Sequence, residues 1–191
     1  PRYGMHLDSL RLGTHLFEID FEPTTLSDWG ALGALIGRQM GGYTHVPVVS
    51  GVAGKPTSDQ LKHFAAAVAS YGSTPLFHIV GVTPEAASLK AVFPDTVPIP
   101  VKVDREALDA FYNSFEFESG PVDIVVFSAP QLSLFELQQL ASLLVGKRIN
   151  PATSLIATTS PEIARAADRM GLTSAITDAG GTLLEGVCFN Q

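Results

Sequence analysis

Apolar and polar positions alternate along most of the chain between segments typical of strands and segments typical of helices. Short apolar runs, which indicate buried strands, occur at residues 45–50, 75–80, 123–127 and 155–158. The segments that follow them predict helices at residues 58–71, 84–92, 134–144 and 161–170. Because strands that alternate with helices of this length are typical of parallel sheets, we expect an α/β fold with a mostly parallel sheet and helices on both faces.

The first part of the chain extends this pattern. Residues 14–21 alternate as a half-buried strand does, and Ser27 is expected to cap a helix that runs to Met40. This helix contains glycines at positions 30, 33 and 37. Because glycine weakens a helix, these residues predict that another backbone packs closely against it.

Other segments complete the set of predicted elements. Residues 97–103 are expected to be extended, and their two prolines place them either at the edge of the sheet or in a crossover. Asp104 is expected to cap a helix that runs to Phe115. Two final short strands are predicted at residues 174–177 and 182–188.

Four segments between a predicted strand and the next predicted helix share one design. Each supplies Ser or Thr hydroxyls and the unpaired N–H groups of a helix N-terminus, at residues 49–57, 80–85, 127–136 and 158–162. Since the carboxyl ends of parallel strands meet at one edge of a sheet, these groups suit a carboxylate or phosphate ligand there. Helix capping alone explains the same residues, so both interpretations stay open.

The segment 74–89 combines such a junction with a histidine. His78 lies on a predicted apolar strand, where it is either a hydrogen-bonded core residue or a ligand or catalytic residue near the strand's end. Thr83 is expected to cap the next helix, with Pro84 at its first position and Glu85 in its first turn. Glu85 is then either a general base or an acid that complements the helix dipole.

A second group of candidate residues lies before the first predicted strand. His6 and Arg11 flank Asp8. Because an arginine side chain binds a carboxylate or a phosphate through two parallel hydrogen bonds, His6 and Arg11 are candidates for an anion-binding pair. A solvated loop explains these residues equally well.

Charge and cysteine content argue against several classes of function. The net charge is −7 and no basic run is present, so neither nucleic acid nor an anionic membrane is expected as the main partner. The apolar runs are too short to span a bilayer, and no secretory leader is visible. Cys188 is the single cysteine, which excludes an internal disulfide framework and favours a cytoplasmic location.

The sequence also bears on domain organisation. No low-complexity linker is present, and the proline-rich stretch 93–100 is the best candidate for a joint between two subdomains. Pro1 is not an initiator residue, and Asn190 and Gln191 come just after a predicted strand. We therefore expect the chain to be a segment of a longer protein.

Six segments together resemble the large-subunit catalytic region of the aconitase X family. They are GMHLDSLR, DWGALGALIGRQMG, HVPVVSGV, LFHIVGVTPEA, SAPQLSLFELQQLASLLVGK and TDAGGTLLEGVC. The most specific features are the run from His78 to Ala86 and the spacing from AGG to Cys188. The resemblance covers nearly the whole chain and implies aconitase-like α/β/α layers.

The resemblance implies a dehydratase that removes water from a small hydroxylated carboxylic acid. Members of this family act on cis-3-hydroxy-L-proline or mevalonate 5-phosphate, and they pair the large region with a small swivelling domain. They use an iron–sulfur cluster or a related bound metal as a Lewis acid, while a base removes a proton next to the carboxylate.

The same resemblance implies roles for individual residues. Cys188 matches a cluster ligand, and the remaining ligands are expected outside this segment. The predicted catalytic residues are His78, Glu85 and Ser133. The predicted substrate-binding residues are His6, Arg11, Thr83 and Gln131.

One departure from the family pattern favours an alternative. Gln131 follows Pro130 where the resemblance leads us to expect histidine, so the role of that position is open. The family's further ligand cysteines are also absent, and this segment by itself is expected to be inactive. The alternative is a non-catalytic α/β domain, a degenerate relative that binds a partner or a small anion.

Overall fold

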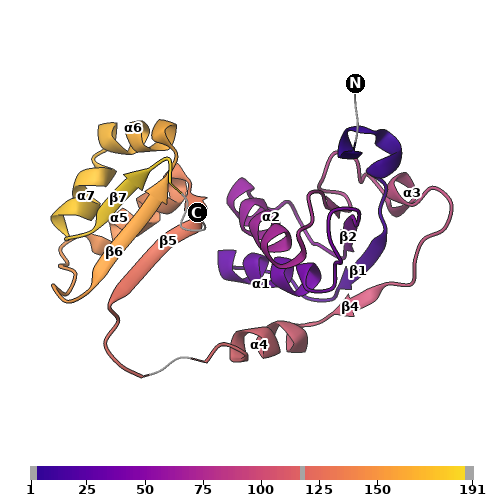
Figure 1. Cartoon of the computed structure of the whole chain (residues 1–191), viewed down its shortest axis with the longest axis horizontal. Coiled ribbons are helices and arrows are strands. Elements are labelled where there is room, and N and C mark those ends of the chain that lie inside the picture. Colours follow the sequence, from indigo (N-terminus) through magenta and orange to yellow (C-terminus); the bar gives the residue numbers. More distant parts are fainter. Residues whose placement is uncertain (1–3, 117–118, 188–191) are drawn as a thin grey trace. The chain divides into compact units, whose positions relative to one another are not determined.

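Two compact units make up the chain, as the computed structural model in Figure 1 shows. The structure describes residues 4–116 and 119–187, and the division between the units follows Glu116. The stretch 93–100, where the sequence placed a joint, lies inside the first unit because it leads into strand β4 (Val101–Val103). The division instead comes after helix α4 (Arg105–Asn113).

The first unit is built on a four-stranded parallel sheet with the strand order β3-β2-β1-β4. Its other strands are β1 (His15–Ile19), β2 (Pro47–Ser50) and β3 (His78–Ile79). Strand β4 lies at the edge, which is one of the two positions predicted from the prolines before it.

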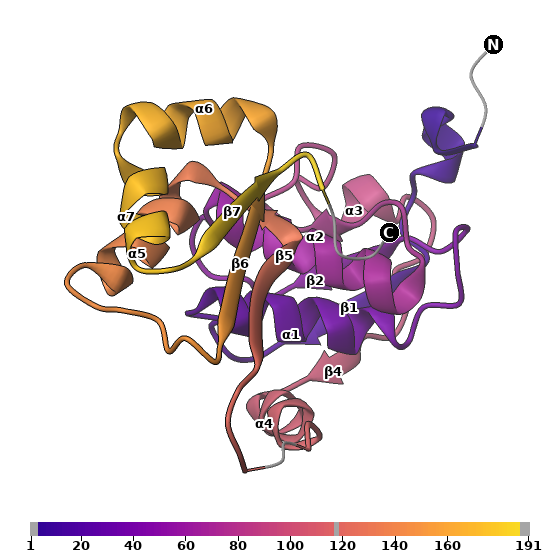
Figure 2. The ribbon, with the colours of Figure 1, turned by 60° about the vertical axis from the view of Figure 1, so that its left-hand side comes forward.

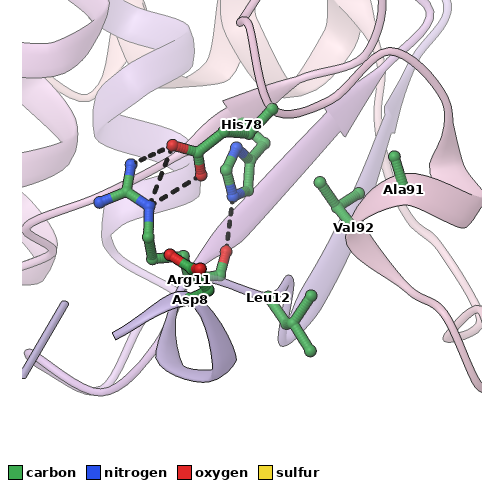
Figure 3. A pocket seen from close by; sticks show the side chains of 7 residues that line it. Asp8, Arg11, Leu12, His78, Ala91 and Val92 are labelled. Atoms are coloured by element: carbon green, nitrogen blue, oxygen red, sulfur yellow. Dashed lines mark hydrogen bonds and ion pairs between the residues drawn. The ribbon is translucent and has the colours of Figure 1, made fainter. Parts of the chain in front are cut away.

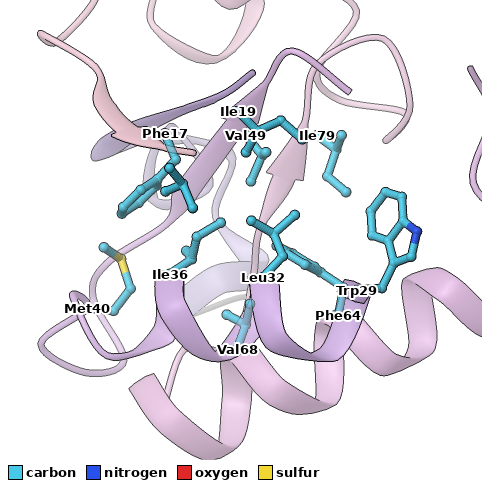
Figure 4. Packing of buried hydrophobic residues seen from close by; sticks show 11 residues of the cluster. Phe17, Ile19, Trp29, Leu32, Ile36, Met40, Val49, Phe64, Val68 and Ile79 are labelled. Carbon is cyan, nitrogen blue, oxygen red and sulfur yellow. The ribbon is translucent and has the colours of Figure 1, made fainter. Parts of the chain in front are cut away.

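Helices cover both faces of this sheet, which confirms the predicted fold class. Helices α1 (Leu26–Gly37) and α2 (Ser58–Gly72) cover one face (Figure 4). The buried core there consists of Phe17, Ile19, Trp29, Leu32, Ile36, Met40, Val49, Phe64, Val68, Ile79 and Val103. On the opposite face a smaller apolar cluster includes residues of the short helix α3 (Leu89–Val92), and its buried members are Leu16, Val48, Ala86, Val92 and Phe93.

Glycines allow α1 to approach α2 closely. A Cβ atom at Gly33 would lie 2.5 Å from the carbonyl oxygen of Phe64, and one at Gly37 would lie 3.0 Å from that of Val68. The predicted close approach is therefore confirmed at these two positions. It is wrong at Gly30, where an added Cβ would have no atom within 4 Å.

The second unit has a three-stranded parallel sheet with the strand order β5-β6-β7 (Figure 2). Its elements are β5 (Ile124–Leu132), α5 (Leu134–Leu144), β6 (Ser154–Thr159), α6 (Pro161–Arg169), α7 (Leu172–Asp178) and β7 (Thr182–Glu185). The core of this unit consists of Leu132, Leu137, Leu140, Ala141, Leu155, Ala157, Ala167 and Ile176. Leu155 and Ala157 lie on the face of the sheet that is covered by this core. Ile124 and Leu184 lie on the opposite face and are exposed.

The predicted strand at residues 174–177 is wrong, because this segment belongs to helix α7. Gly171 adopts a left-handed conformation with φ 73° and ends the previous helix. Leu172 and Ile176 then lie four residues apart, on one side of a helix, and both contact the core of the second unit.

Four predicted helix starts are confirmed. The capping residues Thr57, Asp104, Ser133 and Ser160 each accept a hydrogen bond from the third backbone N–H of their helix. Junctions 49–57 and 80–85 lie in the first unit, while 127–136 and 158–162 lie in the second. One sheet edge in each unit therefore replaces the single edge that the sequence predicts.

Helix α1 begins at a network of hydrogen bonds around Asp28, a residue that is only 5% exposed. Thr25 caps this helix in place of the predicted Ser27, because its hydroxyl accepts from the N–H of Asp28. Asp28 Oδ2 accepts from the N–H groups of Thr24 and Thr25, and Oδ1 accepts from the hydroxyl of Tyr112 at 2.9 Å. Burial alone would raise the pKa of Asp28, but these hydrogen bonds lower it below its ordinary value.

Replacing Asp28 with Asn is expected to lower the free energy of unfolding by about 2 kcal/mol near neutral pH, because an amide offers one acceptor oxygen to donors that now share two. The pKa of Asp28 is lower in the folded protein than in the unfolded chain. The advantage of Asp28 is therefore present above about pH 4 and is lost as the pH falls through the folded-state pKa. Urea denaturation at neutral pH and at about pH 3 measures both effects.

Asp109→Asn is the matched control for this variant. Asp109 pairs with Arg105 at 3.1 Å on α4, and both side chains are 54% exposed. Its loss is expected to change stability by less than about 0.5 kcal/mol. The role of the network would be contradicted if both variants lowered the free energy of unfolding by a similar amount. It would also be contradicted if Asp28→Asn were as destabilising in acid as at neutral pH.

Candidate functional site

Three predicted site residues from separate segments meet in the first unit. Arg11 precedes β1, His78 begins β3, and Glu85 lies in the turn after β3. All three line two cavities, one of about 260 Å³ and one of about 240 Å³. Figure 3 shows the larger one. Their proximity is not visible in the sequence, because Arg11 and Glu85 are 74 positions apart.

The site lies on the sheet face opposite α1 and α2. The register pairs Leu16 with Val48 and Val48 with His78, so these three side chains share that face. Leu16 and Val48 belong to the apolar cluster beneath α3. The sequence predicts ligand-binding groups at the carboxyl ends of the strands. In the structure, the site also includes His78, whose side chain lies on a face of the sheet.

The guanidinium group of Arg11 forms an ion pair with the carboxylate of Glu85. Arg11 Nε donates to Oε1 at 3.0 Å and to Oε2 at 2.9 Å, and Nη2 also donates to Oε1. The third nitrogen, Nη1, donates to the backbone carbonyl of Met5 at 2.9 Å. The hydrogen bonds from Arg11 lower the pKa of Glu85, and the same contact raises the pKa of Arg11.

His78 holds the segment that carries Arg11. Its residue is 1% exposed, and its Nε2 lies 2.7 Å from the backbone carbonyl oxygen of Arg11. Because a carbonyl only accepts, Nε2 carries the proton of this hydrogen bond, so in the neutral form of the ring Nδ1 is the nitrogen with the lone pair. His78 is therefore a buried, hydrogen-bonded core residue, as the first interpretation holds, and it also lines the candidate site.

Gly13 lets this segment lie close to the sheet. A Cβ atom at this position would come within 2.4 Å of Val48 Cγ2 and 2.7 Å of the Phe93 ring. The Gly13 N–H also donates to the carbonyl of Val92 at 2.9 Å. The segment that carries Arg11 is therefore held by His78 and by the backbone at the end of α3.

The predicted helix start at Thr83 is wrong, because residues 83–88 form turns and α3 begins only at Leu89 with Ser88 as its cap. The Thr83 hydroxyl instead accepts from the N–H of Ile79 at 3.0 Å and donates to the carbonyl of Ile79 at 3.2 Å. Gly81, with φ 75°, donates to the carbonyl of Ala86 and closes the turn. This closed turn directs Glu85 toward Arg11.

The structure adds residues that sequence reasoning did not assign to the site. Asp8, Leu12, Ala91 and Val92 line the larger cavity. Asp8 was visible only as the acid between two candidate residues, and no periodicity marks the others. His6 ends a short 3₁₀ turn, Gly4–His6, is exposed, and lines neither cavity.

The other predicted site residues belong to the second unit. Ser133 Oγ accepts from the N–H of Glu136 at 3.2 Å, and Glu136 Oε2 accepts from the N–H of Ser133 at 2.7 Å. Gln131 Nε2 donates to the carbonyl of Val187 at 2.8 Å. Capping thus explains Ser133 structurally, and Gln131 fixes the backbone near the end of the described residues.

A metal site is not formed by the described part of the chain. Within residues 4–116 and 119–187, no three His, Cys, Asp or Glu side chains gather as a metal ion requires. Cys188, the predicted ligand, lies outside the described residues. The described residues therefore do not by themselves fit an iron–sulfur cluster, which needs several thiolates. Over the same residues, no helix has the length and apolar character needed to cross a membrane.

The fold and the site define an α/β protein with two parallel-sheet units and a cluster of arginine, glutamate and histidine in the first unit. The chain matches the aconitase X second domain over residues 13–113 and the aconitase X third domain over residues 122–191. It therefore belongs to the aconitase X family.

Individual relatives agree with this assignment. The phosphomevalonate dehydratase large subunit of Methanothermobacter thermautotrophicus is 35% identical over 99% of this chain and 45% of its own length. The cis-3-hydroxy-L-proline dehydratase of Pseudomonas aeruginosa is 32% identical over 99% of this chain and 33% of its own length. The crystal structure of Thermococcus kodakaraensis aconitase X (holo-form) aligns with a TM-score of 0.87 at 29% identity and covers 99% of this chain and 47% of that one. The chain thus spans between a third and a half of the length of these relatives.

Replacing Arg11 with Gln is expected to raise the pKa of Glu85 toward its ordinary value, because the hydrogen bonds from Arg11 are the main cause of its lowering. Carbon-13 NMR of the side-chain carboxyl group across an acid titration measures the shift. Glu185, a strand residue in the second unit, serves as the internal reference. A Glu85 pKa that stays low in the variant would show that Arg11 does not hold this carboxylate.

Proposed function

We propose that the chain is part of a hydro-lyase of the aconitase X type that removes water from a small hydroxylated carboxylic acid. Candidate substrates are cis-3-hydroxy-L-proline and mevalonate 5-phosphate. The observation that carries the proposal is the convergence of Arg11, His78 and Glu85 on two small cavities. The dehydratase names of the relatives support the same reaction class.

In this proposal Arg11 binds the substrate's anionic group. Its guanidinium is always charged at physiological pH and presents two parallel donors, which match a carboxylate. Leu12, Ala91 and Val92 give the larger cavity an apolar side that suits the carbon skeleton. Thr83 contributes by holding the turn, since both hydrogen bonds of its hydroxyl are made with the backbone of Ile79.

His78 is the proposed proton acceptor of this cluster. Its Nε2–H is fixed on the Arg11 carbonyl, so Nδ1 has the lone pair that takes a proton from the carbon next to the carboxylate. Glu85 lies close enough for charge on His78 to lower the pKa of Glu85 further, so the carboxylate favours the imidazolium that forms.

Glu85 itself is a weak candidate for the base. In the free protein, the hydrogen bonds from Arg11 lower the pKa of Glu85, which keeps the carboxylate ionised and reduces its affinity for a proton. We therefore assign proton transfer to His78 and an electrostatic role to Glu85. Ser133 and Gln131 stay predictions for the second unit, where Gln131 holds the carbonyl of Val187.

Kinetic analysis of the complete protein with both candidate substrates tests these roles. Arg11→Gln is expected to raise KM by about tenfold or more, because the two charge-assisted hydrogen bonds from the guanidinium to the substrate are lost. His78→Gln is expected to lower kcat by about a hundredfold, since the amide still donates to the Arg11 carbonyl but accepts no proton. Arg165→Gln, which breaks an exposed pair with Glu162, is the control.

Each outcome of this assay decides a specific point. Unchanged kcat in His78→Gln would remove His78 from the chemistry. A wild-type protein that binds either acid without turnover would favour the alternative, a non-catalytic anion-binding domain.

The partner and the cofactor are further parts of the proposal. The relatives from methanogens carry the name large subunit, which supports a small swivelling domain or subunit as a partner of this chain. Cys188 is proposed as one ligand of an iron–sulfur cluster or related metal whose other ligands come from outside residues 1–191. The low cysteine content also supports a cytoplasmic location.

Cys188→Ser in the complete protein, purified without oxygen, is expected to lower bound iron and the visible absorbance of the cluster, because one thiolate ligand is lost. Iron and sulfide assays together with the absorbance spectrum measure the change. Full iron content in the variant, or a wild-type protein free of iron and sulfide after reconstitution, would contradict the assignment.

A further inference from the structure

We propose that Glu85 is an internal stand-in for the ligand's carboxylate: it occupies the guanidinium fork of Arg11 in the free protein, and a bound carboxylate takes its place. This inference rests on the proposed function in that it assigns the Arg11 fork to the substrate's anion. It goes further by naming the group that holds the fork before the substrate arrives and the kind of anion that fits there.

The edge of Arg11 that Nε and Nη2 form is occupied by Glu85. Nε and Nη2 both donate to Glu85, while Nη1 donates to the carbonyl of Met5. A carboxylate that approaches the same fork therefore has to displace Glu85. The backbone carbonyl of Arg11 is held by His78, so the arginine stays in place while the glutamate leaves.

Glu85 is free to make this movement. Its side chain is 46% exposed, and it lies in a turn that is closed by backbone hydrogen bonds rather than by its own side chain. Arg11 and Glu85 line both cavities, so rotation of Glu85 away from Arg11 opens space on each side of the fork.

The charges around Arg11 and Glu85 favour the replacement of one carboxylate by another. Arg11 and His78 face Glu85, and Asp8 lies near enough to Arg11 to raise its pKa. Replacing one carboxylate with another on Arg11 keeps the same charge in the fork. An anion that bound without displacing Glu85 would instead add a third negative charge, next to those of Glu85 and Asp8, which is unfavourable.

The geometry of the stand-in indicates which anion fits. Arg11 holds a planar group with two oxygens through its Nε and Nη2 edge. A substrate carboxylate reproduces that contact together with its single negative charge. A phosphate also binds a guanidinium through two oxygens, but it brings a larger negative charge close to Asp8. Mevalonate 5-phosphate carries both groups, and the fork is assigned to its carboxylate.

Glu85→Ala in the complete protein removes the stand-in and keeps Arg11. Acetate is the probe, and its dissociation constant is measured by calorimetry and by shifts of the Arg11 Nε NMR signal near neutral pH. We expect the variant to bind acetate about tenfold or more tightly than the wild type, because the competing carboxylate is gone. Adding Arg11→Gln should abolish the gain, and inorganic phosphate should gain less than acetate.

Glu162→Ala is the matched control. It frees Arg165 of α6 from an exposed pair at 3.1 Å, and Arg165 lines neither of the two cavities, so no gain in acetate binding is expected. Glu85→Gln, which keeps the side-chain shape and removes the charge, should show a smaller gain than Glu85→Ala.

Equal acetate affinity in the wild type and Glu85→Ala would overturn the inference, as would a gain that survives Arg11→Gln. These results are independent of turnover. An Arg11-dependent gain in a protein that dehydrates neither substrate would contradict the proposed function alone, while normal turnover without the gain would contradict the stand-in alone.

Discussion

The hydrogen bond from His78 to the backbone carbonyl of Arg11 connects the start of the chain to the third strand of the first sheet. Together with the bonds of Gly13 to Val92 and of Thr14 to Val46, it fixes the course of the segment before β1 over the sheet. The position of Arg11, the shape of both cavities and the contact with Glu85 all follow from this connection. Because His78 is almost fully buried, its polar ring needs such a partner, and the same need fixes which ring nitrogen keeps the lone pair.

The contact between Arg11 and Glu85 then determines what the site does electrostatically. A partly exposed ion pair contributes little to stability, so its value lies in organisation rather than in folding energy. It keeps Glu85 ionised, it orients the fork toward the cavities, and it leaves proton transfer to His78. The proposed dehydration and the proposed displacement of Glu85 are two consequences of one arrangement.

Local sequence signals predicted much of the fold and less of the site. Capping residues such as Thr57 and Ser133, and the edge strand before Asp104, follow from short-range chemistry and are confirmed. The Thr83 junction carries the same signals, yet its hydroxyl bonds Ile79 in a turn, because the chain must return over the sheet face there. The contact of Arg11 with Glu85 has no local signal, since it depends on strand register and on contacts across 74 positions. The family resemblance supplied the expectation that His78, Thr83, Glu85 and Ser133 lie around the substrate, which periodicity alone does not give.

A crystal structure of the complete protein with a small carboxylic acid bound tests the central claim most directly. The account predicts that the ligand's two carboxylate oxygens lie within hydrogen-bonding distance of Arg11 Nε and Nη2, that Glu85 has rotated away, and that His78 still donates to the Arg11 carbonyl. A ligand carboxylate bound elsewhere, with the Arg11 and Glu85 contact intact, would contradict it.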